Sequence, residues 1–227
     1  MATIRIVNPA TGDLEGEVPN HTVAQCLEAA QKASDTFITW RTTLPRQRAE
    51  ILRRAFEIMI AEQEQLATLI LRENGKVLSD ARAEVAYAAE FFRWFSEEAV
   101  RIDGDLRQAP NGTNWLAVTR EPVGVALCIT PWNFPIWILS QKLPFALAAG
   151  CTCVIKPSEL TPSTTAMLGD LLMQAGLPKG VANIVLGEGQ PVGARMVSHP
   201  DVDMVTFTGS SAVGRAIAAE AGKSLKK

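Results

Sequence analysis

The chain has 227 residues, of which 47% are hydrophobic, and it carries a formal net charge of −2 at pH 7. This length allows one large domain or two small ones, and the composition supports a sizeable buried core. The slightly acidic balance gives no electrostatic reason to expect nucleic acid or an anionic membrane as a partner.

The opening residues and the cysteines bear on cellular location. The start, MATIRIVNPATG, has no apolar core of the length that a signal peptide needs. The four cysteines fall at positions 26, 128, 151 and 153, all in apolar surroundings and without the regular spacing of a disulfide framework. We therefore expect reduced, buried thiols and a cytoplasmic protein.

The first 75 residues begin with turn signals and continue with helical patterns. The turns around Asn8-Pro9 predict a short edge strand over 3–7. Thr22 is a suitable N-cap for a helix that runs to about residue 40, with its apolar side chains on one face. A longer helix is expected over 46–73, and Gly75 suits the left-handed residue that follows a helix end.

A third helix and a hairpin complete the amino-terminal half. The helix is expected from Ser79 to a break at Asp103-Gly104, and its aromatic cluster is interpreted as core rather than site. Two short extended arms over 106–123 surround Asn111-Gly112, a strong hairpin signal. An isolated hairpin is marginal in water, so we expect this one to pack on another surface, such as a second subunit. The aromatic cluster of the third helix comprises Val85, Phe91, Phe92, Trp94 and Phe95.

The stretch 123–135, VGVALCITPWNFP, organises the remaining chain. Its apolar run over 123–130 shows no alternation and has the length of a strand, which is typical of a central parallel strand buried on both faces. Pro131 and Pro135 end the strand and hold the intervening backbone rigid. The uncharged stretch 123–140 could also span a bilayer, but its glycine, prolines and asparagine favour strand, turn and helix.

After residue 123 strands alternate with helices. This alternation predicts an α/β fold with a doubly wound parallel sheet, whose ligands bind at the carboxyl ends of the strands. No strand follows the last helix, so we expect the sheet to be incomplete. The expected strands lie at 123–130, 151–155, 181–186 and 204–207, and the expected helices at about 136–149, 161–176, 192–197 and 211–221.

Two glycine patterns follow these strands. The segment 187–193, GEGQPVG, nearly matches the dinucleotide fingerprint, but its third glycine comes one position late, so the match is weak. The segment 209–216, GSSAVGRA, has the glycines of a phosphate loop, yet Arg215 and Ala216 stand where lysine and a hydroxyl are required. What survives is a glycine turn before a helix, which is either an anion site or a simple helix cap.

Charged and metal-ligating residues give one further candidate. Lys156 and Glu159 follow the second strand on a proline-stiffened loop, where they could bind the two hydroxyls of a ribose or form a surface ion pair. His21 and His199 are far apart and lack neighbouring ligand spacing, so no metal site is expected. Cys151 and Cys153 share one face of a strand and are interpreted as a buried pair.

Three motifs in this order and spacing resemble the aldehyde dehydrogenase superfamily: ITPWNFP at 129–135, IKPSELTP at 155–162 and FTGS at 207–210. The similarity covers the whole chain, since NPATG at 8–12, ENGK at 73–76 and EPVGV at 121–125 also resemble that family. The resemblance implies NAD- or NADP-dependent oxidation of an aldehyde to a carboxylic acid, through a cysteine thiolate, and a Rossmann-like cofactor domain.

Carried over residue by residue, the resemblance makes the Asn133 side chain a donor of the oxyanion hole. Lys156 and Glu159 would hold the adenosine ribose, and a carboxylate at 159 would repel a 2′-phosphate, which favours NAD over NADP. Gly209 and Ser210, with Gly214, would meet the pyrophosphate. The full set of cofactor-binding residues that it implies is Ile129, Thr130, Pro131, Trp132, Asn133, Lys156, Ser158, Glu159, Gly189, Gly193, Phe207, Thr208, Gly209, Ser210 and Gly214.

The resemblance also sets domain boundaries and shows what the chain lacks. Residues 1–105 would be the helical part of the cofactor-binding domain, 106–123 the oligomerisation hairpin of a homo-oligomer, and 124–227 the Rossmann-like part. The family's ELGG and GQxCxA motifs, which carry the general base and the nucleophile, do not occur in the 227 residues. None of the four cysteines suits the nucleophile's role, so the chain resembles an amino-terminal half with the catalytic domain absent.

Two hypotheses from different classes follow. The first is an NAD-dependent aldehyde dehydrogenase of which this chain is a fragment, able to bind NAD weakly but without aldehyde oxidation of its own. Gln141 stands where succinate semialdehyde enzymes of the family commonly have arginine, which argues against a substrate with a distal carboxylate. The second hypothesis is a non-catalytic nucleotide-binding or subunit-interaction module that pairs through its hairpin with full-length enzymes.

Overall fold

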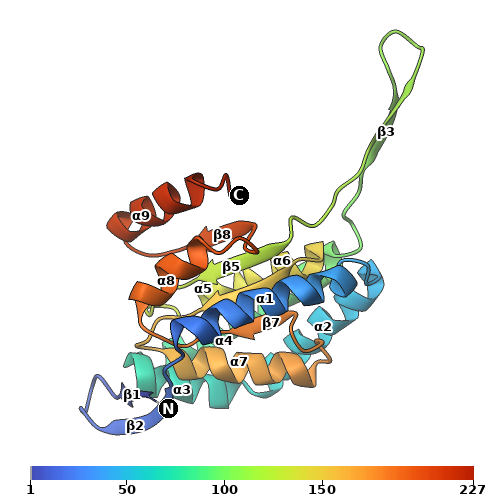
Figure 1. The fold of residues 1–227 in the computed structure, drawn as a ribbon. Helices are drawn as coiled ribbons and strands as arrows, with labels where there is room; N and C mark the ends of the chain where they lie inside the picture. Colours follow the sequence, from blue (N-terminus) through green and yellow to red (C-terminus); the bar gives the residue numbers. More distant parts are fainter. Residues whose placement is uncertain (1) are drawn as a thin grey trace.

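The computed structural model describes residues 2–227, and the side chains of all of these except Gln190 and Pro191. A four-stranded parallel sheet lies at the centre, with helices on both faces and a long hairpin that projects from the body (Figure 1). The elements are β1 (Thr3–Val7), β2 (Leu14–Pro19), α1 (Val23–Trp40), α2 (Pro45–Ala61), α3 (Gln63–Asn74), α4 (Leu78–Glu98), β3 (Asp105–Gln108), β4 (Trp115–Val118), β5 (Val125–Ile129), α5 (Trp137–Ser140), α6 (Leu143–Ala149), β6 (Thr152–Lys156), α7 (Pro162–Gln174), β7 (Ala182–Ile184), α8 (Gly189–Val197), β8 (Met204–Phe207) and α9 (Ser211–Gly222).

The central sheet has the strand order β7-β6-β5-β8, with every neighbouring pair parallel. This confirms the doubly wound sheet expected from the sequence. The chain proceeds from β5 to β6 and β7 in one direction and then returns to place β8 on the other side of β5. The order therefore reverses between β5 and β8, which is where sheets of this kind bind ligands at the carboxyl ends of their strands.

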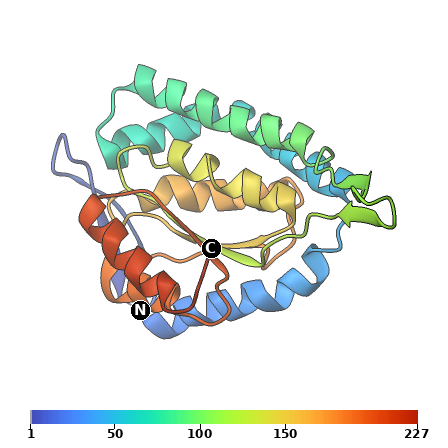
Figure 2. The same ribbon diagram turned by 90° about the horizontal axis from the view of Figure 1, so that it is seen from above.

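Helices cover both faces of the sheet (Figure 2). On one face, Val125 and Leu127 of β5 pack in a cluster with α1, α8 and α9. On the other face, Ala126 and Cys128 pack in a second cluster with α5, α6 and α7, outside which α2, α3 and α4 form a further layer. Burial on both faces explains why the apolar run of β5 shows no alternation.

Most predicted helix ends are confirmed. Thr22 caps α1, accepting a hydrogen bond from the Gln25 N–H while the Gln25 side chain accepts one from the Thr22 N–H, which is a capping box. Gly75 and Gly150 take the left-handed conformation after α3 and α6, with φ of 77° and 92°. These local signals are strong because few other residues satisfy the same backbone geometry.

Two predicted helices are wrong as single elements. The helix expected over 46–73 is divided into α2 and α3 at Glu62, where the backbone has φ −95° and ψ 16°. The helix expected over 136–149 is divided into α5 and α6 at Gln141 and Lys142. The two parts of the first helix share α4 and α7 as neighbours, while α2 alone also contacts α6 and α3 alone also contacts β1 among the main contacts of the fold.

The aromatic cluster of α4 is only partly core, so that prediction also needs correction. Val85 and Phe92 are fully buried, but Trp94 is 62% exposed. Phe91 and Phe95 lie between these extremes. The cluster spans more of the helix circumference than the inner layer can cover, because residues 91, 92, 94 and 95 point in different directions around a helix of 3.6 residues per turn.

Two small antiparallel sheets lie outside the central one. β1 pairs with β2, which confirms the expected strand over 3–7, and β3 pairs with β4 as expected for the hairpin. Every residue of β3 and β4 is exposed, and Trp115 has 69% of its surface accessible. Within residues 2–227, no helix combines the length and the apolar character needed to cross a membrane.

Candidate functional site

A cleft of about 640 Å³ opens at the carboxyl ends of β5, β6 and β8. The segments that follow these three strands meet there because parallel strands end at the same edge of a sheet. Helices α8 and α9 form its remaining wall. The lining residues are Ile129, Thr130, Pro131, Lys156, Pro157, Ser158, Glu159, Gly189, Gly193, Ala194, Val197, Phe207, Thr208, Gly209, Ser210, Val213, Ala216, Ile217 and Glu220.

Lys156 is the buried cation of the cleft. Its residue is 3% exposed, and its ammonium donates to the Pro157 carbonyl at 2.6 Å. Glu159 lies 3.7 Å away and is 42% exposed along its side chain, so the pair places a donor inside the cleft and an acceptor at its margin. Burial lowers the pKa of Lys156, and the nearby Glu159 carboxylate opposes that shift. This arrangement suits a ligand with neighbouring hydroxyl groups.

The glycine turn after β8 supplies an anion-compatible end. Ser210 is the N-cap of α9, and its hydroxyl accepts a hydrogen bond from the Val213 N–H at 3.4 Å. The helix therefore begins at the cleft wall, where its first N–H groups and its dipole favour negative charge. Gly189 has no atom within 4 Å of where a Cβ would stand, so the α8 backbone is open on that side.

The cleft brings together all but three of the residues predicted for cofactor binding. Trp132 and Asn133 follow Pro131 directly but lie outside the lining, and both are exposed. Gly214 packs instead against the Phe207 ring, which would lie 3.3 Å from a Cβ at that position. The two weak glycine patterns thus contribute Gly189, Gly193 and Gly209 to one site although neither match is complete.

One wall of the cleft was not predicted from the sequence. Val213, Ala216, Ile217 and Glu220 line it from α9. Their spacing of three, four and seven residues places them on one helix face. This spacing could have identified them once the glycine turn was assigned to the site. Pro157, Ala194 and Val197 were also missed, and no signal in the sequence marks them.

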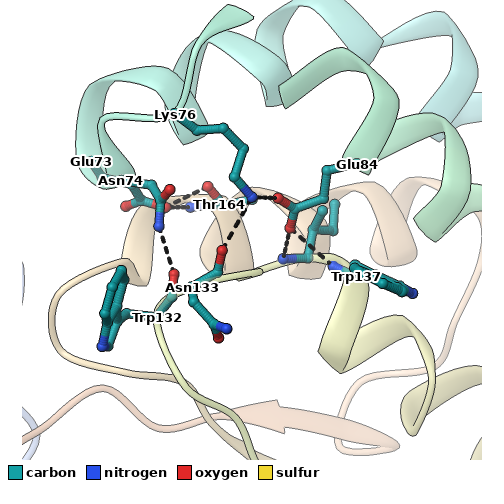
Figure 3. A network of polar contacts seen from close by, with 9 residues as sticks. Glu73, Asn74, Lys76, Glu84, Trp132, Asn133, Trp137 and Thr164 are labelled. Carbon is teal, nitrogen blue, oxygen red and sulfur yellow. Dashed lines mark hydrogen bonds and ion pairs between the residues drawn. The ribbon is translucent and has the colours of Figure 1, made fainter. Parts of the chain in front are cut away.

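The segment 131–137, beyond the end of β5, is bound from behind by residues around α3 and α4 (Figure 3). Asn74 Nδ2 donates to the Trp132 carbonyl at 2.7 Å. Lys76 Nζ donates to the Asn133 carbonyl at 3.1 Å and to the Glu84 carboxylate. We call Asn74, Lys76 and Glu84 the rear clamp. Only Asn74 and Lys76 lie in a motif identified from the sequence, ENGK at 73–76.

No thiol faces the cleft among the lining residues that the structure describes. All four cysteines are free and buried. Cys128 lies within β5 on the opposite face from α1, and burial raises the pKa of Cys26 and Cys151. A buried thiol with a raised pKa is a poor nucleophile. Among the lining residues that the structure describes, none therefore supplies a nucleophilic thiol.

A family comparison and sequence comparisons give concordant results. A model described as the aldehyde dehydrogenase family matches residues 1–227. Glutarate-semialdehyde dehydrogenase of Pseudomonas aeruginosa is 43% identical over 225 residues, which cover 99% of this chain and 47% of that protein. The NADP⁺ succinate-semialdehyde dehydrogenase of Escherichia coli is 41% identical over 224 residues, covering 99% and 46%. The chain spans about half the length of the curated relatives it matches.

Solved structures show the same coverage. An aldehyde dehydrogenase from Brucella melitensis biovar abortus matches with a TM-score of 0.97 and 43% identity, over 99% of this chain and 47% of that one. A betaine aldehyde dehydrogenase from Staphylococcus aureus, solved in complex with NAD⁺, matches with a TM-score of 0.97 and 32% identity, over 100% and 46%.

Proposed function

The chain belongs to the aldehyde dehydrogenase family, and from that membership we propose that residues 1–227 form the NAD-binding part of an enzyme that oxidises an aldehyde to a carboxylic acid. The observation that carries the proposal is the cleft at the ends of β5, β6 and β8. It combines a buried cation, a carboxylate and a glycine turn at a helix N-terminus, which are complementary to ribose hydroxyls and a pyrophosphate.

Asn133 would supply a side-chain N–H to the oxyanion that forms when a nucleophile attacks the aldehyde. A preorganised donor of this kind can lower a barrier by about 3 kcal/mol. Asn133 is exposed at the end of the rigid segment after β5, so its amide is accessible to a substrate. The bound cofactor would accept the hydride. The residues of this chain would bind, orient and stabilise charge, and the nucleophilic thiol is not among them.

Glu159 favours NAD as the cofactor. Its carboxylate stands at the margin of the cleft beside Lys156, where a 2′-phosphate on the ribose would meet a like charge. The relatives include enzymes named for NADP⁺, so the preference is a property we propose for this chain. Gln141 is exposed and neutral, which supports an aldehyde without a distal carboxylate.

The exposed hairpin supports a homo-oligomer. Leu106, Trp115 and Val118 are 67%, 69% and 46% exposed on strands that project from the body. A projecting two-stranded sheet with large apolar side chains is unstable in water unless another surface covers it. We also propose that residues 1–105 form the helical part of the cofactor-binding domain, 106–123 the oligomerisation hairpin and 124–227 the Rossmann-like part.

We further propose a cytoplasmic location, because all four thiols are free.

One alternative has support of its own. The lining residues that the structure describes include no cysteine, which favours a non-catalytic nucleotide-binding or subunit-interaction module. Such a module would pair through its hairpin with a full-length relative. Both proposals place a nucleotide in the same cleft. In the enzyme the bound nucleotide accepts a hydride, whereas in the non-catalytic module it takes no part in a reaction.

Calorimetric titration of purified 1–227 with NAD tests the shared part of both proposals. We expect saturable binding that Lys156→Ala weakens at least fivefold, because it removes the buried donor. The exposed Lys179→Ala variant serves as the matched control. Absence of binding would overturn the cofactor site. Steady NADH production from an aliphatic aldehyde by the mass-verified chain would instead contradict the assignment of these residues as a part without a nucleophile. Co-purification with a full-length relative would favour the alternative.

A further inference from the structure

The rear clamp contacts main-chain atoms on both sides of Asn133. Asn74 and Lys76 bind the carbonyls of residues 132 and 133. Glu84 Oε1 accepts hydrogen bonds from the N–H groups of Ile136 and Trp137 at 3.2 and 3.3 Å. Because these bonds involve the backbone, they fix the course of segment 131–137 whatever side chains it carries. Figure 3 shows the side chain of Asn133 on the far side of the segment from Lys76.

Lys76 and Glu84 form an ion pair away from solvent. Their side chains are 13% and 1% exposed. The Lys76 ammonium also lies 3.8 Å from the centre of the Phe134 ring, a cation–π contact. A buried ion pair commonly adds little net stability compared with an apolar pair of the same size, so its presence here calls for another role. Its remaining hydrogen bonds all go to the segment that carries Asn133.

Packing alone does little to hold the outer part of this segment. Trp132 is 52% exposed, and Asn133 is exposed as well. An exposed side chain has many rotamers and little contact energy to select one. The backbone of residues 132 and 133, from which these side chains project, is held instead by the polar contacts behind it.

We propose that Asn74, Lys76 and Glu84 are positioning residues, which hold segment 131–137 so that Asn133 and Trp132 face the reacting end of a bound dinucleotide. The inference rests on the proposed cofactor site. Within that site, two groups of residues would act on the two ends of the cofactor. Residues after β6 would hold the adenosine end of the cofactor, and the rear clamp would act on the nicotinamide end through the segment after β5.

We therefore predict that mutation of the rear clamp changes the affinities for NAD and for AMP to different extents. AMP occupies only the adenosine end, whereas NAD also reaches the segment beyond Pro131. Loosening the segment should therefore weaken NAD and leave AMP unchanged. A purely structural role would weaken both ligands together, because β5 and β6 are adjacent strands of one sheet.

The test compares NAD and AMP affinities of the 227-residue chain and its Lys76→Met/Glu84→Gln variant. Removing both charges at similar volume avoids leaving one buried charge unpaired. We expect NAD to bind at least fivefold more weakly to the variant and AMP to bind within twofold of the original affinity. The Asn133 side-chain amide signal in a ¹⁵N NMR spectrum should shift with NAD in the original chain and lose that shift in the variant.

Two controls keep the outcomes distinct. Lys179→Met changes an exposed lysine away from the segment and should alter neither affinity. Asn74→Ala removes only the bond to the Trp132 carbonyl, so it tests the inference even if the double variant does not fold, and should show the same split in smaller measure. Failure of the original chain to bind either ligand would overturn the proposed function. If NAD and AMP lose affinity equally in the variants, or if neither loses affinity, only the positioning role is overturned.

Discussion

The carboxylate of Glu73 accepts hydrogen bonds from both the backbone N–H and the hydroxyl of Thr164, which lies 91 residues further along the chain. The N–H distance is 2.9 Å, and the Ser163 N–H donates to the same carboxylate at 2.7 Å. Thr161, the residue before α7, makes no side-chain capping bond. A side chain at the end of α3 thus caps the start of α7 and joins the outer helical layer to the layer beneath it.

Replacing Glu73 with alanine should lower the free energy of unfolding by about 2–4 kcal/mol, because buried donors at the start of α7 lose their acceptor. Urea denaturation measures this change. Glu64→Ala is the matched control, since Glu64 is exposed and its solvent-screened ion pair with Arg82 should contribute far less to stability. Equal losses in the two variants would show that the capping role is wrong.

His21 should make stability depend on pH. Its Nδ1 accepts a hydrogen bond from the Leu186 N–H at 3.0 Å, which requires an unprotonated nitrogen, and burial lowers its pKa. As the pH falls, the imidazole of His21 is therefore protonated at a higher pH in the unfolded chain than in the folded chain. The contribution is complete above the ordinary pKa of about 6.5 and is lost progressively below it.

Urea midpoints at pH 7.5 and 5.5 check the prediction for His21. The His21→Asn variant can still accept through its amide oxygen but does not titrate, so its stability should fall less over this interval. The two chains should differ little at pH 7.5. Parallel pH curves for the two chains would assign the acid sensitivity to other groups.

Gly124 should not tolerate a side chain. Its φ is +123°, and a Cβ would lie 1.9 Å from Oδ2 of Asp203, the atom that accepts a hydrogen bond from the Val125 N–H at 2.8 Å. Gly124→Ala should therefore destabilise the fold by about 2–4 kcal/mol through backbone strain and loss of that bond. Gly16→Ala, where no atom lies within 4 Å, should change thermal stability little. A comparable loss in both variants would contradict the steric reason.

Glu159→Gln should shift cofactor preference toward NADP. Removing the carboxylate at the cleft margin removes the repulsion of a 2′-phosphate, and we expect NADP to bind about tenfold more tightly, equivalent to about 1.4 kcal/mol. Competition between NAD and NADP in calorimetry measures the shift. Glu220→Gln changes a second carboxylate that lines the cleft from α9 and should have a smaller effect. A larger gain in NADP affinity from Glu220→Gln than from Glu159→Gln would indicate that the ribose binds beside α9 instead.

Trp115→Lys should break the oligomer proposed for the hairpin. Placing a charge where an apolar ring is covered by another subunit is strongly unfavourable. Sedimentation velocity should then show a species near the chain mass of 24.5 kDa. Ile38→Lys is the control, since Ile38 is 70% exposed on α1. An original chain that is already monomeric, or a variant with unchanged mass, would contradict the proposal.

Features encoded by neighbouring residues were predictable from the sequence. The N-cap at Thr22, the left-handed Gly75 and the apolar run of β5 each depend on local chemistry, and each is confirmed. The location of the cleft followed from the alternation of strands and helices, because this alternation implies a parallel sheet and ligands bind where parallel strands end. Its glycine and charged residues could be assembled for the same reason.

Features that depend on distant contacts were not predictable. The break at Glu62 contains no glycine or proline, and the helices on its two sides pack together on α4 and α7, which lie far away in the sequence. Glu73 and Glu84 are buried carboxylates whose partners are far along the chain, so their positions in sequence resemble those of ordinary surface residues on a helix. The exposure of Trp94 likewise depends on which layer covers α4, and composition alone does not determine that.

The four buried thiols provide a native probe of conformational opening. Cys26 lies in the layer formed by α1, whereas Cys128 and Cys153 lie in the middle of the sheet on its other face. A thiol that is shielded from solvent reacts with a maleimide only when its surroundings open. Labelling followed by mass spectrometry would therefore time the detachment of α1 separately from the opening of the sheet, without the introduction of further cysteines.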